Sequence, residues 1–102
     1  MITITMHSDK KDRYTGFTIK GHADYDEAGS DIVCAAVSAL SQTALLGLMQ
    51  YASHDVPYEV NDGFLSVQVP KPCEASQIIL GTMVAGLEQI VRQYGEYVVL
   101  DS

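Results

Sequence analysis

An apolar stripe with helical spacing runs through the segment 31–52 and constrains the fold more than any other feature. Its residues recur at steps of three and four positions: Val33, Val37, Leu40, Ala44 and Leu48. A helix with one apolar face is stable when that face packs against another element. Four more apolar residues widen the stripe: Ile32, Leu45, Leu46 and Met49. We therefore expect a well-buried helix that begins after an N-cap at Asp31 or Ser30 and ends near Ala52.

A second helical pattern covers residues 73–94. Its apolar stripe consists of Ile79, Met83, Leu87, Ile90 and Tyr94. The segment Pro70-Lys71-Pro72 ends the preceding strand, and Gly95 is expected to be the C-cap of the helix. A second helix of similar length is therefore predicted.

The other apolar residues occupy every second position, which is typical of strands. This alternation predicts strands over 2–6 and 14–21. Two shorter strands flank the hairpin signal Asn61-Asp62-Gly63, and a closing strand is expected over 97–100. The order β-β-α-β-β-α-β predicts an α+β fold with two helices packed on a mostly antiparallel sheet. With 102 residues, we expect one domain over 1–102.

The charge of the chain limits its partners. Thirteen acidic and six basic side chains give a net charge of −7. Direct binding of nucleic acid is not expected, because phosphate contacts need clustered Lys and Arg, and an acidic surface suits a basic partner. The apolar stretches look too short and interrupted to span a bilayer, and no signal peptide is visible. Two cysteines without an export signal favour a cytoplasmic location.

His22 and Cys34 form the strongest candidate for chemistry. The segment between them leads from a strand end, through an acidic loop, into the first turn of the expected helix. Unpaired N–H groups and the dipole of a helix start stabilise a thiolate, and an imidazole can take the thiol proton. The same N–H groups can hold the oxyanion of an attacked carbonyl. By spacing alone, a buried structural cysteine accounts for Cys34 better than a catalytic one does.

A polar stripe follows Cys34 along the expected helix: Ser38, Ser41 and Gln42. Two interpretations fit this stripe. In the first, these side chains orient His22 or line a substrate groove. In the second, they only solvate the edge of the helix.

Metal sites are poorly matched by the sequence. Counting from Asp24, the third and sixth positions of a calcium loop are Asp26 and Gly29, but Ala28 and Ala35 occupy two positions that need oxygen ligands. The histidines and cysteines lack the paired spacings of zinc sites. We expect no metal and no cofactor.

Cys73 is a rival nucleophile, because it lies beside Pro72 at the start of the second expected helix. It has no histidine near it in sequence. We interpret it as structural or incidental.

The motif Gly21-His22-Ala23, the acidic loop and Asp31-Ile32-Val33-Cys34-Ala35-Ala36-Val37-Ser38 closely resemble the bacterial ribosomal-processing cysteine protease family. Length, element order and the hairpin region agree as well, so the resemblance covers nearly the whole chain. It implies a small cytoplasmic cysteine endopeptidase that forms a homodimer. Such enzymes remove the N-terminal extension of a large-subunit ribosomal protein precursor during ribosome maturation and cut after an aromatic pair.

The resemblance also implies residue roles. Cys34 is the nucleophile and His22 the base of a dyad, and Gly21, Asp31 and Ser38 match supporting positions. The acidic loop supplies a substrate-contacting set: Asp24, Tyr25, Asp26, Glu27 and Gly29. Its charge would attract a basic tail, although any acidic protein has acidic loops. Independently of the resemblance, the polar composition of residues 23–30 predicts a lid that closes over bound substrate; the alternative is a fixed surface loop that only connects two elements.

A different class of function remains open by sequence. It is a non-enzymatic acidic dimer that binds a ribosomal protein or assembly factor without cutting it. The reactivity of Cys34 discriminates the two, because a binding module needs no thiolate.

Overall fold

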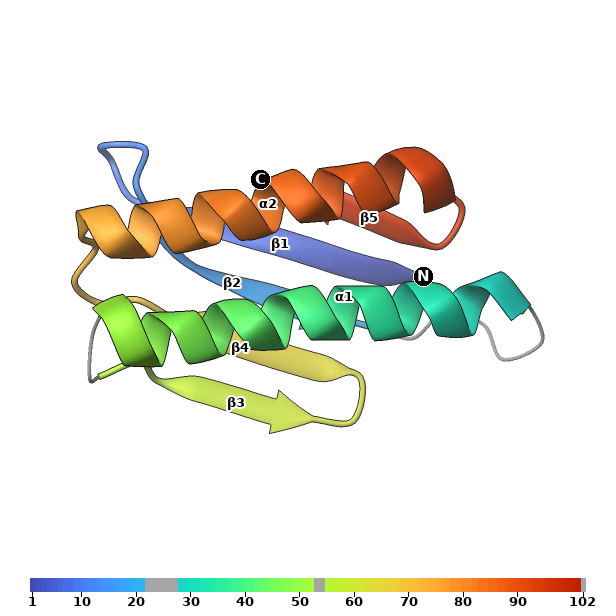
Figure 1. Cartoon of the computed structure of the whole chain (residues 1–102), viewed down its shortest axis with the longest axis horizontal. Helices are drawn as coiled ribbons and strands as arrows, with labels where there is room; N and C mark the ends of the chain where they lie inside the picture. The colour runs from blue at the N-terminus through green and yellow to red at the C-terminus, as the bar shows by residue number, and fades with distance from the viewer. Residues whose placement is uncertain (22–27, 53–54, 102) are drawn as a thin grey trace.

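The protein is built as two layers, a five-stranded sheet with two helices on one of its faces (Figure 1). This computed structural model describes residues 1–21, 28–52 and 55–101, with only the backbone for 28–31. The elements in chain order are β1 (Ile2–Ser8), β2 (Tyr14–Lys20), α1 (Ala28–Gly47), the π-helical turn η1 (Leu48–Ala52), β3 (Tyr58–Asn61), β4 (Phe64–Gln68), α2 (Glu74–Tyr94) and β5 (Val98–Asp101). The predicted α+β fold is confirmed.

The sheet has the strand order β3-β4-β2-β1-β5. Three neighbouring pairs are antiparallel, and β5 lies parallel to β1. The sheet is therefore mixed but mostly antiparallel, as expected. The parallel pair arises because the chain leaves β4, runs along α2 and returns to the far edge of the sheet.

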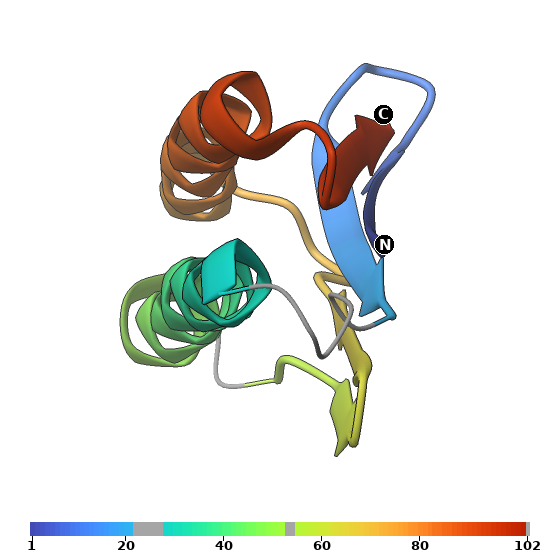
Figure 2. The same ribbon diagram turned by 90° about the vertical axis from the view of Figure 1, so that its right-hand side faces the viewer.

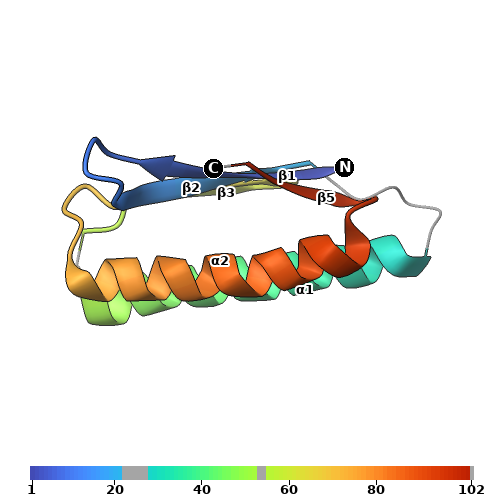
Figure 3. The same cartoon turned by 90° about the horizontal axis from the view of Figure 1, so that it is seen from above.

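The core lies between the sheet and the helices, which cover one face of the sheet only (Figures 2 and 3). Side chains that alternate along the strands explain this arrangement, since every second residue points to the helices. Phe17 and Val67 pair across β2 and β4 and are fully buried, as are Val33 and Leu48 on the helical side. The opposite face of the sheet carries threonines such as Thr3 and Thr18, which are half-buried.

The two helices pack closely because small residues lie at their contacts. A methyl group added at Gly86 would lie 3.1 Å from Leu40 Cδ1, and one at Gly47 would lie 3.7 Å from Ile79. The helices run in opposite directions along the sheet (Figure 1).

The start of α1 differs from the sequence-based expectation. The helix begins at Ala28, so neither Asp31 nor Ser30 is its N-cap. The residue types that cap helices are also favourable inside the first turn, where acidic side chains meet the positive end of the dipole. Sequence patterns therefore fix the existence of a helix better than its first residue.

The burial of α1 is also lower than expected. The stripe residues Val33, Val37 and Leu48 are buried, but Ile32 and Leu46 are 59% and 63% exposed. The sheet and α2 cover only part of the helix circumference, so the wider stripe extends past the covered part.

One described stretch, Ile32–Ala52, is long and apolar enough by length and composition to cross a membrane, contrary to the expectation from sequence. The core helix of a globular domain can have the same length and composition. Within this stretch, 33% of the 18-residue apolar window is buried inside the molecule. Packing of this stretch on the sheet accounts for its buried apolar residues.

Candidate active site

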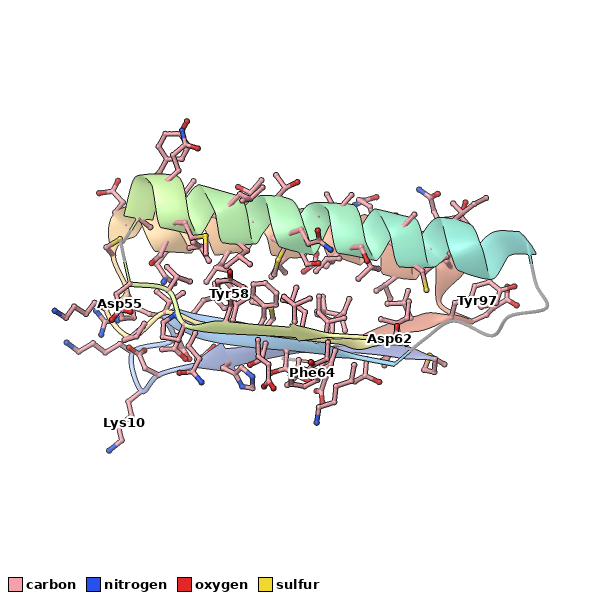
Figure 4. The ribbon with its side chains drawn as sticks, turned by 90° about the horizontal axis from the view of Figure 1, so that it is seen from below. Lys10, Asp55, Tyr58, Asp62, Phe64 and Tyr97 are labelled. Carbon is pink, nitrogen blue, oxygen red and sulfur yellow. The ribbon has the colours of Figure 1, made fainter. Side chains whose placement is uncertain are left out.

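A groove of about 250 Å³ separates α1 from the β3–β4 hairpin. From α1 it is lined by Cys34, Val37, Ser38, Ser41 and Gln42. The facing wall consists of Val60, Asn61, Asp62, Gly63, Phe64 and Leu65, and Ile2, Ile19 and Gly21 complete the lining. In Figure 4, Tyr58 lies between α1 and the sheet, on the strand that continues into this hairpin. The groove is therefore built by the edge of the sheet and one side of a helix.

Cys34 is half-buried, is not in a disulfide and lies in this groove. It is the seventh residue of α1 rather than part of its first turn. The unpaired N–H groups of a helix are confined to its first four residues, and the dipole effect fades within the first turn. The expected stabilisation of a Cys34 thiolate by a helix start is therefore wrong, because the helix begins earlier than the capping residues indicated.

Cys73 has the environment that the sequence had suggested for Cys34. It is the N-cap of α2, and its backbone N–H donates to Ser76 Oγ at 2.9 Å in a capping box. Hydrogen bonds from the Ser76 backbone N–H, and then from its side chain, lower the pKa of the exposed Cys73 thiol. However, Cys73 does not line the groove, and its sulfur instead lies 3.8 Å from the Ala52 carbonyl oxygen. An acidic thiol and the groove thiol are thus two different residues.

All three residues of the polar stripe, Ser38, Ser41 and Gln42, line the groove. This agrees with the first of the two interpretations that the sequence left open. Ser41 is 1% exposed, and its hydroxyl donates to the Val37 carbonyl at 2.8 Å. The proton of that hydroxyl is used inside its own helix, so toward the groove Ser41 can act only as a hydrogen-bond acceptor. Ser38 and Gln42 are exposed and form the polar rim on the α1 side.

Gly21 fixes the path of the chain as it leaves β2 toward His22. Its φ is +101°, and a methyl group there would collide with the Met1 carbonyl oxygen. Its N–H donates to the Gly63 carbonyl at 2.9 Å, and Gly63 has a φ of +72°. The residue before His22 is thus tied directly to the tip of the hairpin that forms one wall of the groove.

The structure brings together three predicted site residues: Gly21, Cys34 and Ser38. Several others lie outside the described residues: His22, Asp24, Tyr25, Asp26 and Glu27. Gly29 and Asp31 belong to the first turn of α1, where the backbone alone is described.

Sequence analysis missed the role of the hairpin as a wall of the groove. The Asn61-Asp62-Gly63 motif predicted the turn, but nothing in it indicates which helix the turn faces. Within residues 1–21, 28–52 and 55–101, no three His, Cys, Asp or Glu side chains are grouped so as to hold a metal ion.

The model of the family described as cysteine protease Prp matches residues 1–99. The chain belongs to the Prp family of cysteine proteases. It is 34% identical to the ribosomal processing cysteine protease Prp of Staphylococcus aureus strain Mu50, and the match covers 99% of this chain and 98% of the relative.

Solved structures of Prp from S. aureus agree in fold. The essential ribosomal processing protease in complex with a covalently linked product peptide is 30% identical, with a TM-score of 0.87 over 99% of this chain and 98% of the other. The same protease in complex with a substrate peptide is 27% identical, with a TM-score of 0.84 and the same coverage. This chain is thus a cysteine protease, and of its two cysteines only Cys34 lines the groove.

Replacement of Gly21 by alanine should destabilise the fold by about 1–3 kcal/mol, because a side chain at this positive φ is strained and meets Met1. Urea unfolding measures the change. Gly81→Ala is the matched control, because a methyl group there meets nothing within 4 Å and Gly81 lies inside α2. The control should be stabilised by up to about 1 kcal/mol. Equal stability of the Gly21 variant and the parent would contradict this account.

The thiol of Cys73 should react faster near neutral pH than an unstructured cysteine, because its folded-state pKa is lowered and more thiolate is present at a given pH. Alkylation rates against pH, measured in Cys34→Ala protein, report Cys73 alone. Ser76→Ala should move the profile to higher pH, and unfolding in urea should remove the advantage. An unchanged profile in the Ser76 variant would show that the Ser76 side chain does not contribute to this acidity, because the backbone N–H of residue 76 survives the substitution.

Proposed function

We propose that this protease removes the N-terminal extension of a large-subunit ribosomal protein during ribosome maturation, with Cys34 as nucleophile and His22 as general base. The observation that carries the proposal is the position of Cys34 in the groove between α1 and the hairpin, beside Gly21. His22 follows Gly21 directly in sequence. The proposed enzyme is a single-domain protein that acts in the cytoplasm as a homodimer and needs no cofactor.

The groove favours Cys34 over Cys73 as the nucleophile, although hydrogen bonds from Ser76 lower the pKa of Cys73. A protease must hold an extended peptide next to its nucleophile, and the groove offers walls on both sides of Cys34. Cys73 is exposed at the N-terminal end of α2, where its thiol faces the first turn of that helix. Position relative to the peptide, rather than acidity alone, supports the assignment of Cys34 as the nucleophile.

The proposed chemistry follows from the two side chains. The His22 imidazole takes the proton of the Cys34 thiol, and the thiolate attacks the carbonyl carbon of the scissile peptide bond. The imidazolium then returns the proton to the departing amine, which leaves a thioester on Cys34. Water, activated by the same imidazole, hydrolyses this thioester. Because Cys34 lies beyond the first turn of α1, activation of the thiol depends chiefly on His22.

The groove suits the proposed substrate in two respects. Its lining includes the apolar residues Ile2, Ile19 and Leu65, and apolar lining residues favour the aromatic side chains expected next to the cut. Ribosomal proteins are basic, and this chain has a net charge of −7 with an acidic segment that joins His22 to Cys34. The S. aureus relative is a ribosomal processing protease whose structures contain substrate and product peptides. The non-enzymatic alternative has no observation in its favour.

Substitution of Cys34 by alanine should abolish cleavage of the ribosomal protein precursor while the protein stays folded. Incubation with the precursor followed by mass spectrometry measures one defined cut. Cys73→Ser is the matched control and should keep most of the activity. His22→Ala should reduce turnover by about 10²–10⁴-fold, because positioned acid–base groups contribute that much.

Two results would reverse the assignment. One is full activity of the Cys34 variant, and the other is loss of activity in a folded Cys73 variant. Full activity of the His22 variant would exclude the dyad but leave the nucleophile in place.

Charge reversal of Asp24, Asp26 and Glu27 to lysine should weaken cleavage of a basic precursor, mainly through a higher KM. The physical reason is electrostatic attraction between an acidic segment and a basic tail, which salt screens over about 10 Å at 0.1 M. The defect should therefore shrink as salt is raised. A triple reversal at Glu88, Glu96 and Asp101, which are exposed and lie outside the groove lining, controls for net charge. An equal loss in both variants would show that only total charge matters.

A further inference from the structure

The two walls of the groove differ in charge. The α1 wall is uncharged, because the segment from Ile32 to Ala52 contains no Asp, Glu, Lys or Arg. The hairpin wall carries Asp62, and among the described residues that line the groove it is the single Asp, Glu, Lys or Arg. Within this described lining, a charged group of a bound peptide therefore meets an opposite charge on the hairpin side only.

Asp62 is held in place by the turn that carries it. Asn61 pairs with Phe64, so Asp62 and Gly63 form the whole connection between β3 and β4. The Gly63 carbonyl accepts a hydrogen bond from the Gly21 N–H at 2.9 Å, which joins the turn to the end of β2. An Asp side chain adds few rotatable bonds to this anchored backbone. Little conformational entropy is therefore lost when its carboxylate binds a cation.

The surroundings of Asp62 strengthen an ion pair once a peptide fills the groove. Val60, Phe64 and Leu65 contribute apolar surface to the same wall. A peptide that lies against this surface displaces water, and opposite charges attract each other more strongly where water is excluded. Asp62 itself is exposed, so a cation of the peptide reaches it from solvent without entering the core.

The basic residues of the chain lie away from the groove. Three of the six belong to the turn 9–13, at the opposite end of the sheet from the hairpin turn, as the positions of Lys10 and Asp62 show (Figure 4). Lys20 belongs to the strand beside the hairpin, but its side chain lies on the helix-free face because that of Ile19 packs in the core. None of the six, all of which the structure describes, lines the groove. A Lys or Arg cation in the groove therefore belongs to the ligand.

We infer that Asp62 is a specificity-determining residue of the protease and selects a Lys or Arg side chain in the peptide that occupies the groove. Its carboxylate accepts hydrogen bonds from the ammonium or guanidinium group, and such bonds are stronger than those between neutral groups. This inference rests on the proposed function and adds to it a residue that discriminates between peptides. It differs from long-range attraction by the acidic segment between His22 and Cys34, because Asp62 acts at one position of the peptide rather than on its total charge.

Other ligands fit Asp62 less well. A divalent cation needs several oxygen ligands, and the described part of the chain has no group of three His, Cys, Asp or Glu side chains that could hold one. A nucleic acid would bring phosphates of like charge to the carboxylate. Ion pairs on an open surface give little selectivity, and the groove is what distinguishes Asp62 from the other exposed carboxylates of the chain.

Cleavage of a set of peptides by the full chain tests the inference. Each peptide keeps the aromatic pair expected at the cut, is acetylated so that its terminal ammonium is removed, and carries Lys or Gln at one varied position. For wild-type protein, kcat/KM should be about five- to tenfold higher with Lys than with Gln at one position, as a hydrogen-bonded ion pair supplies. Asp62→Asn, checked for folding by circular dichroism, should bring this ratio to about one. Asp62→Lys should prefer Glu over Gln at the same position.

Asp101→Asn is the matched control. It removes the same charge from an exposed residue of β5, at the edge of the sheet opposite to the hairpin, and Asp101 does not line the groove. Its ratio of Lys to Gln cleavage should equal that of the wild-type protein. Fluorescence anisotropy of the same peptides with Cys34→Ala protein, with and without Asp62→Asn, gives the comparison for binding without cleavage.

Three results would overturn the inference. The first is a wild-type protein that prefers Lys at no position, and the second is a preference that Asp62→Asn leaves intact. The third is an equal loss in Asp62→Asn and Asp101→Asn, which would show that only net charge matters. All three are measured on peptides that are cleaved, so the proposed protease function survives them. If no peptide is cleaved, the proposed function is contradicted instead, and the binding comparison in Cys34→Ala protein decides the role of Asp62.

Discussion

The packing of α1 on the sheet is the interaction on which the rest of the structure depends. Val33 and Leu48 are fully buried opposite strand residues such as Phe17 and Val67. Burial of this stripe fixes the rotation of the helix about its own axis, and the rotation decides where every other residue of α1 lies. Cys34 follows Val33 directly, so it lies at the boundary of the core, half-buried and in the groove. The same rotation turns Leu46 to the outside and Ser41 into the interior. A core contact therefore positions the proposed nucleophile.

Hydrophobic periodicity was sufficient to predict the elements and their order, because each period reports which face meets the core. It could not predict the first residue of α1. Asp31 and Ser30 favour an N-cap, but they are equally compatible with a first turn, and the helix in fact begins at Ala28. This displacement of about one turn matters chemically, because the field of a helix start is strong only there. The groove could not be predicted from the sequence, for a different reason. Its second wall is the hairpin 60–65, and its contact with α1 exists only after the sheet has formed.

The two cysteines separate two properties that are often treated as one. Cys73 has hydrogen bonds at a helix N-cap that lower the pKa of its thiol, whereas Cys34 lies in the groove. Acidity raises the fraction of thiolate, but attack also requires a carbonyl carbon held in line with the sulfur. The wall, rim and neighbouring glycine around Cys34 are the features that point to peptide chemistry, and its family membership agrees with a cysteine nucleophile.

The parallel pairing of β5 with β1 has a consequence for how the chain is made. Strand β1 is separated in sequence from β5 by both helices and the other three strands, yet one of its edges is covered only by residues 98–101. Until those residues emerge, β1 exposes an open row of backbone donors and acceptors, and such edges invite pairing with other chains. Contacts between segments so far apart in sequence also form slowly. During synthesis, β1 therefore keeps this edge open until the segment 98–101 has been made and has paired with it.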